Sequence, residues 1–301
     1  MLADIRNRTP HMTIVRPLND EDLPQLTALL WQHKETSLFI LGNLELSGLA
    51  AGDEPYQGDY IGGFVDGELR GVIVRYWNGN CMPQGDAATV MDIWQQSPVF
   101  RTGTNGFVGQ YERCLQLRDA YLQEHQLTES ALALNSREVL YELPLSQLTL
   151  PDVATQAASR LSLATEDDMT FLLPWMIDYN VETLNATRGQ ALAEHCHDSL
   201  RNRIQLRNCF VFWQGGTPVA TTGFNARVQT MIQVGGVFTP EAFRGRGYAQ
   251  AAVGLSLQQV MQEGVEHCVL FTDEHNQAAR GAYERLGFQF TGYFGLYLVT
   301  A

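Results

Sequence analysis

The chain has 301 residues, enough for two domains of ordinary size, and its 45% hydrophobic and 18% charged residues exclude an intrinsically disordered protein. Its 33 acidic side chains outnumber 20 basic ones, giving a net charge of −13, so it should repel the phosphate backbone of nucleic acids. Basic small molecules or basic peptide tails match this charge better. No apolar run approaches the roughly 18 residues of a membrane helix, the first residues lack the apolar core of a signal peptide, and the five scattered cysteines form no C-x-x-C pair. We therefore expect a cytoplasmic protein without a membrane anchor.

The first half opens with a predicted strand at residues 13–18. Asn19 then precedes a run of acids, which is typical of a helix amino terminus. Further on, residues 60–65 and 69–76 flank Asp66-Gly67, the pattern of a β-hairpin. Residues 140–145 look like a closing strand.

The second half repeats this opening. Residues 160–164 alternate as in a strand, Thr165 precedes another acidic first turn, and residues 209–213 and 218–224 form a second predicted hairpin. The repetition indicates a duplicated architecture with domains at 1–150 and 151–301. From residue 160 onward the expected order is β-α-α-β-β-β-α-β-α-β, an α/β fold with a mixed sheet and helices on both faces.

The most informative segment is a glycine-rich loop between a strand at 231–239 and a helix extending to about residue 264. Helix amino termini present unpaired N–H groups and a positive dipole end, which suit a phosphate. Gly245 and Gly247 would let a diphosphate approach the backbone, and Arg244 and Arg246 would add positive charge. Taken alone, the same residues could form a turn that only connects strand to helix, and no Walker loop or dinucleotide fingerprint is present.

A second segment follows the strand at 265–272. Asn276 and Tyr283 are two helical turns apart and share one helix face, and Gly287 suits a left-handed carboxyl-terminal cap. Taken alone, Asn276 could be an ordinary helix cap and Tyr283 a packed aromatic residue.

Together the two segments resemble the GNAT superfamily of acyl-CoA-dependent N-acetyltransferases. The Q/R-x-x-G-x-G/A loop of that family is matched by the run from Arg244 to Ala249. Its strand–helix with Asn and Y-x-x-x-G-F is matched by Asn276 and by the run from Tyr283 to Phe288. The resemblance covers about residues 160–299, and the first half is then expected to be a degenerate GNAT-like domain.

The resemblance also implies the roles of individual residues. Val237, Phe238 and Thr239 would lie along the pantetheine arm of acetyl-CoA, and Asn276 would bond that arm. The pyrophosphate would lie on Arg244, Gly245, Arg246, Gly247, Tyr248 and Ala249. Tyr283 would protonate the departing thiolate as general acid, and a backbone N–H near Val237 or Phe238 would stabilise the developing oxyanion.

The general base is unassigned. Many family members have a Glu on the strand before the loop, but residues 229–239 of this chain contain no carboxylate. Asp178 and Glu182 are one helical turn apart in the first helical region, although a solvated helix face explains them more simply. His195 and His197 diverge on a helix, so no metal site is expected.

The first half contains one segment that could be a degenerate GNAT cofactor loop. Residues 101–110 are rich in glycine and precede a helix, but they lack the loop pattern and no Asn and Tyr helix follows.

The resemblance therefore implies an N-acetyltransferase in which a small-molecule amine or a peptide amino group attacks acetyl-CoA directly. The alternative is a CoA-binding regulatory protein that has lost catalysis.

Overall fold

The computed structural model describes residues 12–300, and its contacts divide the chain into two units. Unit 1 runs to Leu132 and includes the last segment from Gly295, whereas unit 2 is Ala133–Phe294. The division lies before the 150/151 boundary expected from the sequence. The reason is that the strand following Leu132 pairs with a strand of unit 2.

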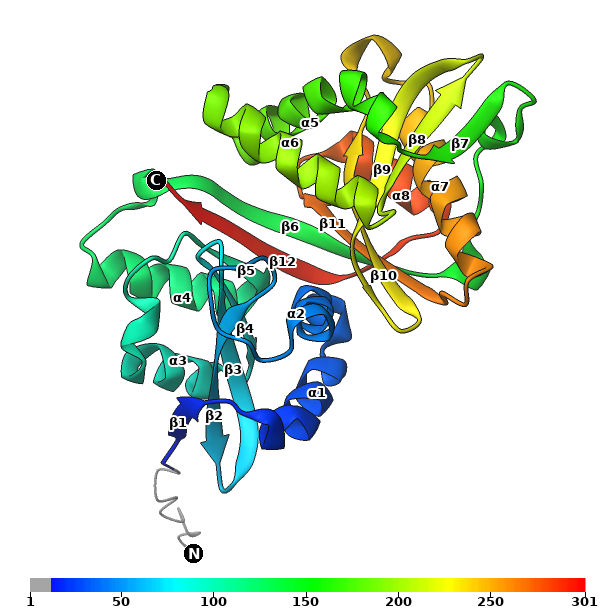
Figure 1. Cartoon of the computed structure of the whole chain (residues 1–301). Coiled ribbons are helices and arrows are strands. Elements are labelled where there is room, and N and C mark those ends of the chain that lie inside the picture. Colours follow the sequence, from blue (N-terminus) through cyan, green and yellow to red (C-terminus); the bar gives the residue numbers. More distant parts are fainter. Residues whose placement is uncertain (1–11, 301) are drawn as a thin grey trace, which may run out of the picture. The chain divides into compact units, whose positions relative to one another are not determined.

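Unit 1 is a mixed sheet with helices on both faces (Figure 1). Its strand order is β1-β2-β3-β4-β5-β12, in which β4 and β5 run parallel and the pairs from β1 to β4 are antiparallel. Buried aromatic rings fill its core, with Trp94 stacked on Phe100 and Phe107 against Tyr121. Its elements are β1 (Ile14–Pro17), α1 (Leu23–Gln32), α2 (Lys34–Ser47), β2 (Gly58–Val65), β3 (Glu68–Tyr76), β4 (Asn80–Gly85), α3 (Ala87–Gln96), β5 (Gly106–Gln110) and α4 (Tyr111–Glu124).

Unit 2 has a mixed sheet in the order β12-β6-β11-β10-β9-β8-β7. Strands β10 and β11 pair in parallel, whereas β6 pairs antiparallel with β11 on its other edge. Its elements are β6 (Leu132–Pro144), β7 (Ser159–Leu163), α5 (Met169–Leu184), α6 (Gln190–Gln205), β8 (Cys209–Gln214), β9 (Thr217–Val228), β10 (Met231–Phe238), α7 (Tyr248–Met261), β11 (His267–Asp273), α8 (Gln277–Leu286) and β12 (Gln289–Val299).

Helices cover both faces of the unit 2 sheet. On one face, Val253 and Leu257 of α7 and Leu286 of α8 pack against strand residues of β6, β10 and β11. On the other face, Leu172 of α5 and Leu200 of α6 pack against β8. The α/β class and the element order expected from residue 160 onward are confirmed.

The duplicated opening is present in atomic detail. In unit 1 the Asn19 N–H donates to Asp22 Oδ2 at 2.9 Å, and in unit 2 the Thr165 N–H donates to Asp168 Oδ2 at 2.8 Å. The first capping box follows β1 and the second follows β7, and each precedes a pair of helices. Local sequence chemistry therefore sets the same entry into both units.

The five cysteines are free and buried, as expected for small core residues. Among residues 12–300, no helix is both long and apolar enough to cross a bilayer. Over the same described range, no group of His, Cys, Asp and Glu side chains is arranged to hold a metal ion.

Candidate active site

Two neighbouring parallel strands of unit 2 separate part-way along their length. Strands β10 and β11 are in register from Met231↔His267 to Gln233↔Val269, and among the described residues the register extends no further. Their carboxyl-terminal parts, residues 234–238 and 270–273, therefore leave backbone N–H and C=O groups available along the two edges of a split.

The backbone of β10 bends where the split begins. Its pairing with β9 shifts between Gln233 and Val234 and again between Gly235 and Phe238. Glycine is favoured at this point, because a Cβ on Gly235 would clash with the Asn225 side chain unless that side chain moved, and Gly236 has φ +65°. Strand β10 thus carries a bulge at Gly235-Gly236.

The loop after β10 leads directly to the amino terminus of α7. Gly245 and Gly247 have φ +75° and +78°, and no atom lies within 4 Å of a Cβ built on Gly245. The run from Arg244 to Gly247 is exposed, so the first N–H groups of α7 are open to a ligand. The Thr239 hydroxyl, at the start of this loop, is buried and has no hydrogen-bond partner in the described structure.

Arg244 is already engaged within the protein. Its Nη2 lies 2.6 Å from Glu182 Oε2 on α5, and its Nε donates to the Thr239 carbonyl at 2.9 Å. These contacts attach the loop to α5 and partly neutralise the Arg244 charge. Asp178 is likewise paired, at 2.6 Å from Arg188. The two acids of α5 are thus members of surface ion pairs.

Tyr283 lies on α8, and Asn276 is the residue that caps its amino terminus. Tyr283 is 8% exposed, and its ring packs edge-on to Phe288 at 5.9 Å. Burial raises the pKa of Tyr283, and the nearby Tyr179 and Cys268 raise it further. Asn276 Oδ1 accepts the Ala279 N–H at 3.1 Å and so caps α8, leaving its amide NH2 as the group able to donate to a ligand.

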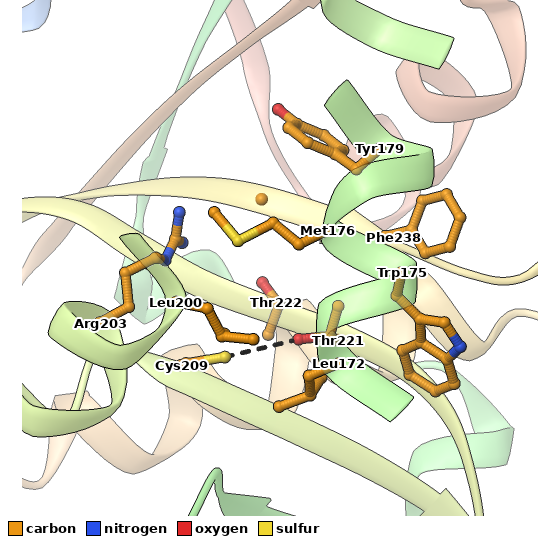
Figure 2. Close-up of a pocket in the computed structure, with 11 residues that line it drawn as sticks. Leu172, Trp175, Met176, Tyr179, Leu200, Arg203, Cys209, Thr221, Thr222 and Phe238 are labelled. Atoms are coloured by element: carbon orange, nitrogen blue, oxygen red, sulfur yellow. Dashed lines mark hydrogen bonds between the residues drawn. The ribbon is translucent and has the colours of Figure 1, made fainter. Parts of the chain in front are cut away.

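A mostly apolar cavity lies on the α5–α6 side of the split. Figure 2 shows Leu172, Trp175, Met176 and Tyr179 along one helix, facing the strand residues Thr222 and Phe238. Arg203 of α6 closes one end, where it donates to the Gly235 carbonyl at 3.2 Å. The cavity reaches Gly236, so it adjoins the bulge of β10. The Thr222 hydroxyl, buried in this lining, has no partner in the described structure.

Tyr179 connects this cavity to the other groups around the split. Burial and the Glu138 carboxylate raise the pKa of Tyr179. Arg203 and a hydrogen bond from the Gly236 N–H lower it. Neither Tyr179 nor Glu138 lies in the matched motifs, so no pattern in the sequence singles them out.

Three comparisons with known proteins bear on this geometry. The model of the acetyltransferase (GNAT) family matches residues 172–288, which span α5 to the end of α8. Residues 172–288 of the chain therefore match a GNAT acetyltransferase domain. No curated protein sequence matches the chain.

Solved structures share the fold of the GNAT domain and extend the likeness to the rest of the chain. A tandem GNAT protein of the clavulanic acid biosynthesis pathway is 14% identical, with 95% of this chain and 98% of that one covered and a TM-score of 0.58. A GCN5-related N-acetyltransferase from Sphaerobacter thermophilus is 14% identical, with 95% and 94% covered and a TM-score of 0.57. A Drosophila protein is 11% identical, with 96% and 99% covered and a TM-score of 0.66. At these identities the likeness concerns the fold.

Unit 1 lacks the loop of the GNAT domain. Its β4-α3-β5-α4 order parallels β10-α7-β11-α8, but α3 begins directly after Asp86, which occupies the cap position. A carboxylate there would repel a phosphate. The glycine-rich segment 101–110 does not supply a loop either, because it is strand from Gly106 onward and α4 follows at once.

Proposed function

We propose that the chain is an N-acetyltransferase that binds acetyl-CoA in the split between β10 and β11 and transfers the acetyl group to an amine. The observation that carries this proposal is the separation of the two strands after Gln233 and Val269, next to a loop that opens on the start of α7. An extended amide chain can pair with the strand edges while its diphosphate lies on the helix amino terminus.

The loop residues would divide the work of holding the diphosphate. Backbone N–H groups from Gly245 to Ala249 would bind the phosphate oxygens, and Arg246 would add charge. Arg244 would contribute less charge than its position in the motif implies, because Glu182 already pairs with it. Val237, Phe238, Thr239 and the Asn276 amide would contact the pantetheine arm.

Tyr283 would supply a proton to the thiolate that leaves. Its raised pKa keeps the hydroxyl protonated at any ordinary working pH, so the donor form is always present. A backbone N–H at Val237 or Phe238, in the separated part of β10, would donate to the thioester oxygen as negative charge develops there. The amine would attack directly, with no covalent intermediate on the protein.

The acceptor amine would enter from the α5–α6 side. That side holds the cavity next to Gly236, and its lining of Leu172, Trp175, Met176 and Phe238 suits an amine with an apolar portion. The net charge of −13 favours a cationic acceptor over an anionic one.

Calorimetric titration of the full chain with acetyl-CoA, followed by a thiol-release assay over a panel of small amines and peptides, tests the proposal. We expect binding, and thiol release that depends on the amine. Binding without amine-dependent release would contradict transfer and leave a CoA-binding protein. An absence of binding would contradict the site itself.

A further inference from the structure

The GNAT domain has no carboxylate on β10, yet a buried carboxylate lies two strands away. Glu138 is on β6 and is 7% exposed. It is directly opposite Asp273, the last residue of β11, and therefore beside the part of β11 that has left β10.

The strand alternation places Glu138 on the side from which the amine would enter. Val139, Tyr141 and Leu143 pack in the same core as Tyr283 and Leu286 of α8. Because successive side chains of a strand point to opposite faces, Glu138 points to the face covered by α5. Its electrostatic effect on the Tyr179 hydroxyl agrees with this placement.

A short hydrogen-bonded cluster holds the carboxylate. Ser136 Oγ donates to Glu138 Oε1 at 2.6 Å and lies 3.1 Å from Asp273 Oδ2. The titratable groups that face Glu138 are Asp273 and Glu274 from the end of β11 and Tyr179 from α5. No cation is among the groups that shift its titration, and Glu274 is itself paired with Arg137 at the surface. Within residues 12–300, Glu138 is thus a buried carboxylate without a neutralising ion pair.

We propose that Glu138 is the general base of the transfer reaction, a catalytic residue that accepts the proton of the incoming ammonium group. This inference rests on the proposed function. Burial raises the pKa of Glu138 to about 7, with a lowering contribution from Ser136 and raising ones from Asp273 and Glu274. A carboxylate that titrates near neutrality is a stronger base than an exposed one.

The protons balance in two steps. The ammonium form of the acceptor gives one proton to Glu138, which passes it to water, and the freed lone pair then attacks the thioester carbon. As the N–C bond forms and the C–S bond breaks, the nitrogen gives its second proton to water and Tyr283 donates its own proton to the thiolate. Water then returns one proton to Tyr283, so the thiol leaves protonated and both residues are restored.

The test compares Glu138→Gln with a matched control, Glu142→Gln. Glu142 lies on the same strand and the same face, but it is paired with His267 at 3.2 Å, away from the open end of the split. We expect Glu138→Gln to lower kcat by about a hundredfold or more, to leave the Kd for acetyl-CoA unchanged and to remove the acidic limb of the pH–rate profile near neutrality. Glu142→Gln should retain the parental rate and limb.

A second variant reads out the titration of Glu138 without removing it. Ser136→Ala deletes the hydrogen bond that lowers its pKa, so the acidic limb should move to higher pH while kcat at alkaline pH is kept. A Glu138→Gln variant that keeps the parental kcat and the parental acidic limb would overturn the assignment of Glu138 as the base. It would not contradict the transfer reaction. A wild-type chain that binds acetyl-CoA but acetylates no amine would overturn the transfer reaction, and the assignment with it.

Discussion

The diphosphate-binding role of the loop can be tested at Gly245 with a single methyl group. Gly245 has φ +75°, and a Cβ there would meet no atom within 4 Å. Gly245→Ala therefore introduces backbone strain of about 1 kcal/mol but no clash with the protein. If the open space in front of Gly245 holds the diphosphate, the methyl group would keep a phosphate oxygen from the backbone N–H groups.

The expected loss can be estimated from the interaction removed. A hydrogen bond to a charged group contributes about 1.5–3 kcal/mol, which corresponds to a roughly ten- to hundredfold increase in the Kd for acetyl-CoA. Gly247 is a less suitable position, because a Cβ built there would lie 3.4 Å from Val153 Cγ1. A change in the Kd for acetyl-CoA could then come from altered packing as well as from lost phosphate contacts.

Gly264 provides the matched control. It follows α7 at the end opposite to the loop, has φ +88° and likewise has no atom within 4 Å of a built Cβ. Gly245→Ala and Gly264→Ala should therefore lose similar amounts of stability in urea unfolding, while only the first weakens acetyl-CoA binding in calorimetry. Equal and parental Kd values for both variants would refute the placement of the diphosphate.

Three further predictions follow from the same structure. Tyr283→Phe removes one hydroxyl and keeps the packed ring, so kcat should fall about ten- to hundredfold with little change in the Kd for acetyl-CoA or in the thermal midpoint; parental turnover would show that another group is the acid. Titration should give one acetyl-CoA per chain, because Asp86 takes the place of a phosphate loop in unit 1, and a stoichiometry of two would contradict that reasoning. Burial raises the pKa of Glu138 from the ordinary 4.5 to about 7, so the folded state binds this proton more tightly than the unfolded state. Its contribution to stability is then full below pH ~4.5 and is lost as the pH rises to about 7; in urea unfolding, Glu138→Gln should exceed the parent by at most about 3 kcal/mol at pH 8 and match it at acidic pH. A stability difference that does not vary with pH would contradict the buried, unpaired carboxylate.

Signals that act within a few residues predict much of the fold. The hairpin at Asp66-Gly67 and the one at Gly215-Gly216 both turn through residues with positive φ, as two-residue hairpins require. The Thr165 cap and the left-handed Gly287 after α8 follow from the same kind of local chemistry. In each case the residue type alone sets the backbone conformation, so the element can be placed without knowing its partners.

Spacing within one motif also brings several candidate site residues into a single region. The loop glycines precede α7, and Tyr283 lies in the core beside β10 and β11. The ion pair between Arg244 and Glu182 is not predictable in this way, because it joins residues of different elements whose packing no local pattern encodes.

The strand that carries Glu138 shows where local reasoning stops. The sequence predicts a closing strand at residues 140–145 and makes no prediction for the polar run Ser136-Arg137-Glu138 before it. In the structure β6 begins at Leu132 and lies between β11 and β12, so Ser136 and Glu138 are buried although their own side chains give no sign of it. Periodicity indicates that a segment is a strand, but the partner strands determine which of its polar residues lose water. A candidate base taken from residues 151–301 alone therefore cannot include Glu138. Glu138, the proposed base, lies on β6, which ends before the domain boundary predicted at 150/151. The contacts place Glu138 in unit 2, which begins at Ala133.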